Sequence, residues 1–165
     1  MSDGLKLTVD LDIDVKYSDT YRFLQYKAHF YAVDSKGAFV NEKFVDLGET
    51  TDNPRGLIVE DRFKKGYKQF FISLHCGGTQ SYLFAFKDQK FYTAFINNQA
   101  RVAVDVLPSK NGTWRLRESE ARKWAGHVEP RPNVRISKYA VSTTWLITPK
   151  SKPILKIQYP YKDAN

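Results

Sequence analysis

The opening segment of the chain alternates apolar and polar residues without a break, and this pattern restricts the fold more than any other. From Leu5 to Val15 every odd-numbered residue is Leu, Val or Ile, and every even-numbered residue is Lys, Thr or Asp. Side chains of a β-strand point alternately to its two faces, so the segment predicts a strand with one buried and one solvated face. The aspartates on the solvated face also discourage pairing with another chain.

Aromatic residues extend this β interpretation over the rest of the chain. The sequence has 3 Trp, 10 Tyr and 11 Phe but a single Met, which is typical of a pleated core rather than a helical bundle. Residues 21–33 fit two patterns: alternation predicts a strand, whereas an N-cap at Ser18 or Asp19 would begin a helix, and the aromatic density favours the strand. Further strands are predicted at 38–47, 70–76, 81–86, 91–96, 100–106, 134–147 and 154–159.

One helix is expected at residues 115–125, closed by Gly126. The longest loop is expected at 50–56, and a hairpin turn at 87–90. The predicted fold class is mainly β, an antiparallel sandwich or barrel with one or two short helices, or α+β if residues 20–33 are helical. A chain of 165 residues is expected to form a single domain, residues 1–165.

Composition and missing motifs exclude several classes of protein. With 42% apolar residues the chain is too hydrophobic to be disordered, and its apolar stretches are too short to cross a membrane. The single cysteine, Cys76, excludes a disulfide framework, the three histidines are dispersed, and the common phosphate, dinucleotide and zinc motifs are missing, so no metal and no cofactor is expected. No signal peptide is recognised at the N-terminus, which predicts a cytoplasmic protein; a mature secreted form without its leader is the alternative.

The charge is divided unequally along the chain. The net charge is +8, but residues 1–60 hold 7 basic and 11 acidic residues, whereas residues 61–165 hold 19 and 7. Cations interleaved with Tyr and Trp favour a phosphate backbone with unpaired bases, so RNA or another anionic partner is expected; the alternative is a solvated surface that only maintains solubility. The candidate nucleic-acid-binding residues are Arg115, Arg117, Lys123, Arg131, Arg135 and Lys138.

The order of several segments resembles the N-terminal half of the ribosome-inactivating proteins, which are rRNA N-glycosidases. The similar pieces are an opening strand with a Tyr-x-Phe continuation, a strand followed by an aromatic cluster, a run that carries a second stacking aromatic, and a shortened Glu-Ala-Ala-Arg helix. In this sequence they are 13–24, 70–76 with 81–86 and 91–95, 111–116, and 119–122.

The resemblance implies a catalytic site. Tyr82 and Trp114 would stack on a flipped adenine, Arg122 would stabilise charge on the purine, and Glu120 would support the oxocarbenium-like sugar and its attacking water. Glu120 and Arg122 are two residues apart where the family has three. The implied function is that of a diverged or truncated rRNA N-glycosidase-like hydrolase, active or inactive. The residues alone leave another hypothesis open: a non-enzymatic antiparallel β module that binds nucleic acid, acidic protein or glycan, or a structural, virion-type β protein.

Overall fold

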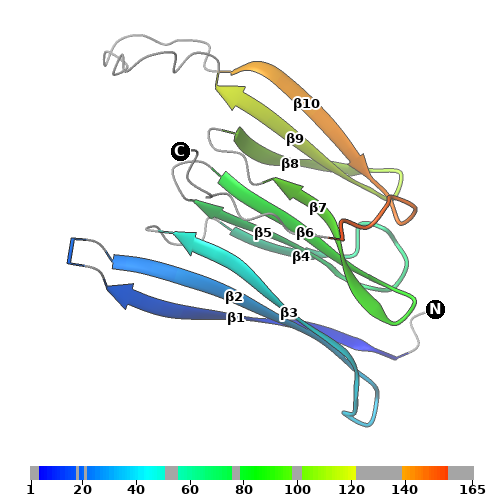
Figure 1. Ribbon diagram of the computed structural model, residues 1–165. Coiled ribbons are helices and arrows are strands. Elements are labelled where there is room, and N and C mark those ends of the chain that lie inside the picture. The colour runs from blue at the N-terminus through cyan, green and yellow to red at the C-terminus, as the bar shows by residue number, and fades with distance from the viewer. Residues whose placement is uncertain are drawn as a thin grey trace.

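The protein is built from strands. The computed structural model describes residues 4–17, 19–20, 22–50, 56–75, 79–97, 102–121 and 139–155, and within these ranges it contains ten strands and no helix (Figure 1). The predicted mainly β class is therefore confirmed, and the short helices expected beside the strands are not found in these ranges. The strands are β1 Lys6–Tyr17, β2 Arg22–Val33, β3 Phe39–Thr50, β4 Gly56–Glu60, β5 Gln69–His75, β6 Thr79–Lys87, β7 Lys90–Asn97, β8 Val102–Lys110, β9 Thr113–Ala121 and β10 Tyr139–Ile147.

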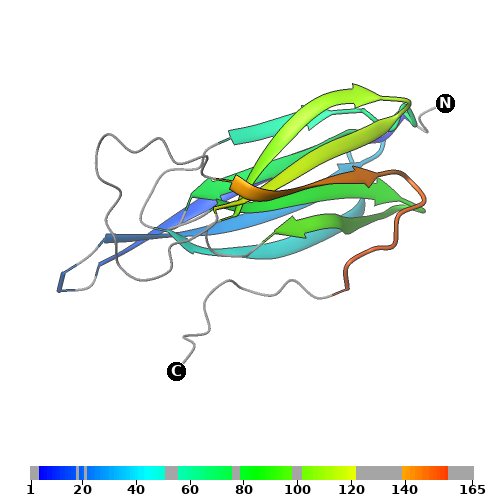
Figure 2. The ribbon, with the colours of Figure 1, turned by 90° about the horizontal axis from the view of Figure 1, so that it is seen from above.

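Within each sheet, the strands that follow one another in the chain pair with one another. They form three antiparallel sheets in the orders β1-β2-β3, β4-β5-β6-β7 and β8-β9-β10. Figure 1 shows the sheets stacked as layers, with the four-stranded sheet between the other two, and in Figure 2, which is seen from above, the three sheets lie over one another. The fold is therefore a three-layer antiparallel sandwich. In the described part of the chain, no helix is long and apolar enough to cross a membrane.

The central sheet is buried on both faces, which explains the apolar runs of β5, β6 and β7. In β6 the side chains of Tyr82, Phe84 and Phe86 enter a first core, shared with β2 and β3. The side chains between them, Leu83 and Ala85, enter a second core, shared with β9 and β10. A strand with core on both sides needs apolar residues at consecutive positions, so it loses the alternation of a half-buried strand.

The outer sheet β1-β2-β3 has the two unlike faces that its alternation predicts. Leu7, Val9 and Leu11 of β1 pack against the first core. The opposite face carries charge, and there Lys27 of β2 forms a 3.1 Å ion pair with Asp14 of β1. β2 itself is a strand over Arg22–Val33, so the strand interpretation of residues 21–33 is confirmed and the helical alternative is wrong.

The helix expected at residues 115–125 is wrong for 115–121, which belong to β9. Asn111 and Gly112 have φ values of 53° and 67°, as in a type I′ turn, and this turn sends the chain straight back along β8. Pairing with β8 and β10 on both sides then outweighs the helix propensity of the Arg, Leu, Glu and Ala residues. Within β9, the Glu118 carboxylate accepts a 3.1 Å hydrogen bond from the Asn97 side chain of β7.

The remaining predicted elements agree with the structure where it describes them. The return strand at 38–47, the strands at 81–86 and 91–96 and the turn at 87–90 correspond to β3, β6, β7 and the β6–β7 turn. β4 was not predicted, because its five residues follow the expected 50–56 loop without a clear alternation. Residues 51–55, 76–78, 98–101, 122–138 and 156–165 lie outside the described residues, so positions 134–138 of the strand expected at 134–147 and positions 156–159 of the strand expected at 154–159 stay predictions. The described start of the latter contributes an isolated antiparallel bridge between Ile154 and Thr93.

Candidate functional site

Tyr82, predicted to stack on adenine, lies in the first core. Its side chain has no solvent exposure. The hydroxyl donates to the carbonyl oxygen of Leu47 at 3.1 Å, and Gln80 Oε1 lies 3.2 Å away. The ring stacks on Phe84 at 6.0 Å between centroids. The Tyr82 side chain therefore links the central sheet to β3 through its hydrogen bond to Leu47.

Trp114, the second predicted stacking residue, lies in the second core and is also fully buried. Its Nε1 donates to Gln69 Oε1 at 3.0 Å, and the Arg62 guanidinium lies 4.3 Å from the ring centroid, in cation–π contact. Phe71 stacks beside it at 6.2 Å. The structure thus places Tyr82 and Trp114 in different cores and does not bring their rings together.

The other predicted site residues are only partly described. Glu120 lies in β9, paired with Val102 and Val141, rather than on the helix that the resemblance implies. Arg117, also in β9, pairs with Asp105 at 2.8 Å, and Arg115 Nη1 lies 3.5 Å from the carbonyl oxygen of Pro108. Arg122, Lys123, Arg131, Arg135 and Lys138 lie outside the described residues. N-glycosidase activity stays a prediction of the resemblance.

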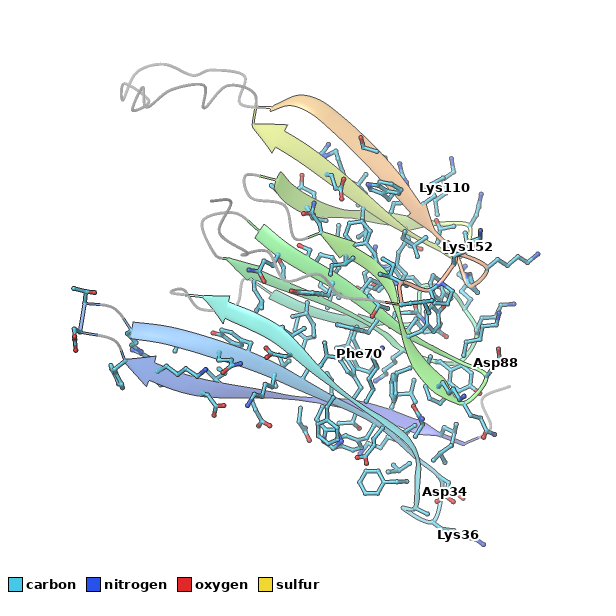
Figure 3. The ribbon with its side chains drawn as sticks, viewed as in Figure 1. Asp34, Lys36, Phe70, Asp88, Lys110 and Lys152 are labelled. Atoms are coloured by element: carbon cyan, nitrogen blue, oxygen red, sulfur yellow. The ribbon has the colours of Figure 1, made fainter. Side chains whose placement is uncertain are left out.

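Because the strands run up and down in sequence order, alternate connections gather at the same end of the sandwich. Figure 1 shows the β2–β3, β4–β5, β6–β7 and β8–β9 connections and the segment after β10 together at one end. Figure 3 shows Lys36, Asp88, Lys110 and Lys152 at this end. Loops far apart in the sequence thereby form one surface.

This surface is rich in lysine, and we refer to it as the lysine end. Its lysines are all exposed, and none of their ammonium groups has an ion-pair partner among the described residues. Two of the three aspartates here are occupied by the backbone, since Asp34 accepts from the amides of residues 36 and 38, and Asp61 from those of 65 and 66. The third is Asp88. The lysines of the lysine end are Lys36, Lys64, Lys65, Lys68, Lys87, Lys90, Lys110, Lys150 and Lys152.

A cavity of about 410 Å³ opens within the lysine end. It lies between the 61–68 loop, the β6–β7 turn and Pro149. Four aromatic side chains line it: Phe63, Tyr67, Phe86 and Tyr92. Its polar lining residues are Lys65, Lys87, Asp88, Gln69 and Gln89. The cavity therefore combines apolar walls with cations, the usual composition of a small-ligand site.

One wall of the cavity is fixed by the buried side chain of Gln69. Its Oε1 accepts hydrogen bonds from the amides of Arg62 at 2.8 Å and Phe63 at 3.2 Å, as well as from Trp114. Its Nε2 donates to the carbonyl oxygen of Tyr67 and to Asp61 Oδ1. The 61–68 loop is thus held in shape by groups of its own and by the second core.

The other wall is a turn in an unfavourable conformation. Asp88 and Gln89 have φ values of 51° and 59°, the pattern of a type I′ hairpin. Such turns favour Asn or Asp at the first of these positions and Gly at the second, as the β8–β9 hairpin has at 111–112, so the strained residue here is Gln89, at a cost of about 1–2 kcal/mol. The β6–β7 turn therefore keeps a glutamine side chain at the cavity, where glycine would be preferred, at the expense of stability.

Tyr92 supplies a phenol to the cavity. Burial, and to a smaller extent the negative charge of Asp88, raises the pKa of Tyr92 above its usual value of 10.0. The group therefore stays protonated at neutral pH and can donate a hydrogen bond. No cluster of three His, Cys, Asp or Glu side chains that could hold a metal ion is found within the described ranges.

A second unusual surface lies on the outer face of β2 and β3. Four rings form a row there: Phe44 stacks on His29 at 4.1 Å, His29 lies 5.1 Å from Tyr31, and Tyr31 lies 5.7 Å from Phe39. Phe39 is 65% and Phe44 70% exposed. His29 Nε2 lies 2.9 Å from Glu42, and Asp10, Asp12, Asp14 and Asp46 belong to the same sheet. This aromatic row is bordered by carboxylates, unlike the lysine end.

No family model, curated protein or solved structure matches this chain. The interpretation of the site therefore rests on its own residues.

The sequence predicts a basic surface, but it does not point to the residues of the lysine end. Of the two candidate nucleic-acid-binding residues that the structure describes, Arg115 and Arg117, the first lies two residues after the start of β9 at the β8–β9 turn, and none of the six candidates is among the lysines assigned to the lysine end. The signal that could have found these lysines is their position beside turns. In a chain of consecutive antiparallel strands, every second turn lies at the same end, so lysines at alternate turns converge.

Proposed function

We propose that this protein is a non-enzymatic binding module that holds a polyanion, single-stranded RNA, at the lysine end. The observation that carries the proposal is the set of nine exposed lysines that five connections place at one end of the sandwich (Figure 1), where the aromatic-lined cavity also opens. Since these lysines have no ion-pair partner among the described residues, they are available to replace the counterions of a phosphate backbone. The outer face of β1-β2-β3 is unsuited to the same ligand because its carboxylates repel phosphate.

The aromatic cavity favours single-stranded nucleic acid over an acidic protein. A protein carboxylate needs only cations, whereas an unpaired base also needs a flat apolar surface to stack on. The half-buried rings of Tyr67 and Tyr92 supply such a surface next to Lys65 and Lys87, alongside the buried Phe63 and Phe86. Both requirements are met within one end of the sandwich.

Salt dependence with a matched pair of variants tests the proposal. Fluorescence anisotropy would measure binding of a labelled short oligouridylate to the protein between about 50 and 200 mM salt. The variant Lys110→Glu/Lys150→Glu removes two lysines of the lysine end that do not line the cavity. We expect this variant to bind the oligonucleotide roughly tenfold more weakly or worse. We also expect the slope of log K against log salt concentration to become less negative by about 0.7 for each phosphate that the variant no longer neutralises.

The control variant is Lys16→Glu/Arg22→Glu, which changes the net charge equally at the opposite end of the β1–β2 pair. It should bind the oligonucleotide nearly as tightly as the wild type does. Equal weakening in both variants, or affinity that does not respond to salt, would contradict a site at the lysine end. Release of free adenine from ribosomal RNA during incubation with the protein would instead support the N-glycosidase and refute a purely binding role.

A further inference from the structure

We propose that the cavity of the lysine end binds one unstacked nucleotide, with its base against the aromatic walls and its phosphate at Lys65 and Lys87. This inference rests on the proposed RNA-binding function and names the part of the ligand that the cavity takes. The same chemistry would fit a nucleoside monophosphate free in solution, and the experiment below separates the two sources.

The size and the apolar lining of the cavity fit a base. A volume of about 410 Å³ lies within the range of small-ligand sites. Phe63 and Phe86 are almost completely buried and line it with apolar surface, while the half-buried Tyr67 and Tyr92 extend towards solvent. A planar base that enters would replace water on the exposed parts of the Tyr67 and Tyr92 rings, and stacking of this kind tolerates any base.

The charges of the cavity orient the nucleotide. Lys65 and Lys87 lie on the 61–68 loop and at the β6–β7 turn, on two different walls, and both are exposed. A phosphate between them gains two cations, whereas a phosphate beside Asp88 would be repelled. The base edge is therefore expected near Asp88 and Gln89, whose carboxylate and amide groups can accept hydrogen bonds from amino groups or, for the amide, also donate.

Gln69 cannot contact the base edge in this way, although it lines the cavity. Its Oε1 already accepts from Arg62, Phe63 and Trp114, and its Nε2 donates to the loop. The residues available to contact a base edge are those of the strained β6–β7 turn. Backbone strain held at a cavity is the kind of outlier from which a functional role is inferred, because a less strained Asn-Gly would close the same hairpin.

Two ligands test the cavity in the intact protein. The first is an oligomer with the ribose-phosphate backbone of oligouridylate but no bases, measured by anisotropy against oligouridylate itself. We expect the base-free oligomer to bind roughly tenfold more weakly at the same salt concentration, because it has no base to stack. The second is uridine or adenosine monophosphate, titrated against labelled protein and followed by amide chemical shifts, which should change at 61–68 and 86–92.

Single-residue variants test which side chains of the cavity bind the base and the phosphate. Tyr92→Ala should remove most of the difference between oligouridylate and the base-free oligomer, and Lys87→Ala, at an exposed position that does not threaten folding, should weaken mononucleotide binding. Phe44→Ala, which removes an exposed ring from the aromatic row, is the control and should change neither.

The outcomes separate this inference from the proposed function. Salt-dependent binding of both oligomers with equal affinity, unchanged by Tyr92→Ala, would overturn the nucleotide cavity and leave RNA binding by the lysine end intact. If a mononucleotide changes the amide chemical shifts at the cavity but no oligomer binds, the cavity would be a site for free nucleotides and the proposed RNA-binding function would be refuted. Absence of both signals would overturn both.

Discussion

A single side-chain oxygen connects the cavity wall to the second core. Oε1 of Gln69 accepts from two backbone amides and from the indole of Trp114, so three donors depend on one acceptor. Gln69 is 1% exposed, which leaves little water to replace it. A buried donor without a partner loses the free energy of its hydration, and that loss exceeds the net gain of the bond itself.

The substitution Gln69→Leu should therefore destabilise the folded protein. We expect it to lower the free energy of unfolding by at least about 2 kcal/mol, since each stranded buried donor costs about 1–3 kcal/mol. Urea denaturation measures the change. Tyr26→Phe is the control, because the buried Tyr26 hydroxyl has no hydrogen-bond partner among the described residues and its removal should cost nothing. A loss of stability in Tyr26→Phe as large as that in Gln69→Leu would contradict this explanation.

The residue scale is also where prediction from the sequence was weakest. The resemblance to ribosome-inactivating proteins implied that Tyr82 and Trp114 stack on a ligand, but a sandwich with two cores also needs large rings to fill its interior. Composition does not tell a ring that packs inside from one that faces a ligand. Tyr67 and Tyr92 are no more conspicuous in the sequence than Tyr82, and only the meeting of the 61–68 loop with the β6–β7 turn places them at a cavity.

Among the elements, β3 is an edge strand that carries a lysine on its inner side. Lys43 pairs in register with Phe30, whose side chain is fully buried in the first core. Burial lowers the pKa of Lys43 below its usual value of 10.5. An inward-pointing charge on an edge strand discourages pairing with a strand from another molecule, since that pairing would cover the ammonium group.

The lowered pKa fixes the sign of a pH effect. The folded protein holds the Lys43 proton less tightly than the unfolded chain does, so this residue costs stability below its folded-state pKa, and the cost disappears as pH rises to 10.5. Lys43→Met should stabilise the protein at neutral pH, by roughly 0.5 kcal/mol or less. Denaturation curves at pH 7 and above pH 10.5 should show this gain shrinking. A gain for Lys43→Met that stays constant between these pH values would refute the assignment.

The sequence predicts a strand correctly where the order of apolar and polar residues depends only on which of its faces are buried. β1 follows from its alternation, and β6 and β7 follow from dense apolar runs around the 87–90 turn. β9 could not be recognised because its composition suits a helix, and what decides for a strand is its pairing with β8 and β10 along its two edges. The lysine end depends in addition on the stacking of the three sheets, which brings together turns far apart in the sequence (Figure 1), so the site was less predictable than the fold class.

For the whole molecule, the two cores share one sheet. Neighbouring residues of β6, such as Leu83 and Phe84, belong to different cores. A substitution in the first core therefore loosens the backbone that also supports the second. Neither outer sheet of three strands has another apolar surface to cover its inner face, so we expect the layers to unfold together rather than to peel away one at a time.

Hydrogen exchange can test this coupling across the full thickness of the sandwich. Phe30→Ala, in β2, empties part of the first core and should cost about 3–5 kcal/mol of unfolding free energy. If the layers unfold together, the slowest amides of β9 should exchange faster by the same free energy as the slowest amides of β2, although β9 touches only the second core. The exposed Phe44→Ala should leave both unchanged. Faster exchange in β2 with unaltered protection in β9 would show that the three layers open separately, and that the central sheet does not transmit the destabilisation from one core to the other.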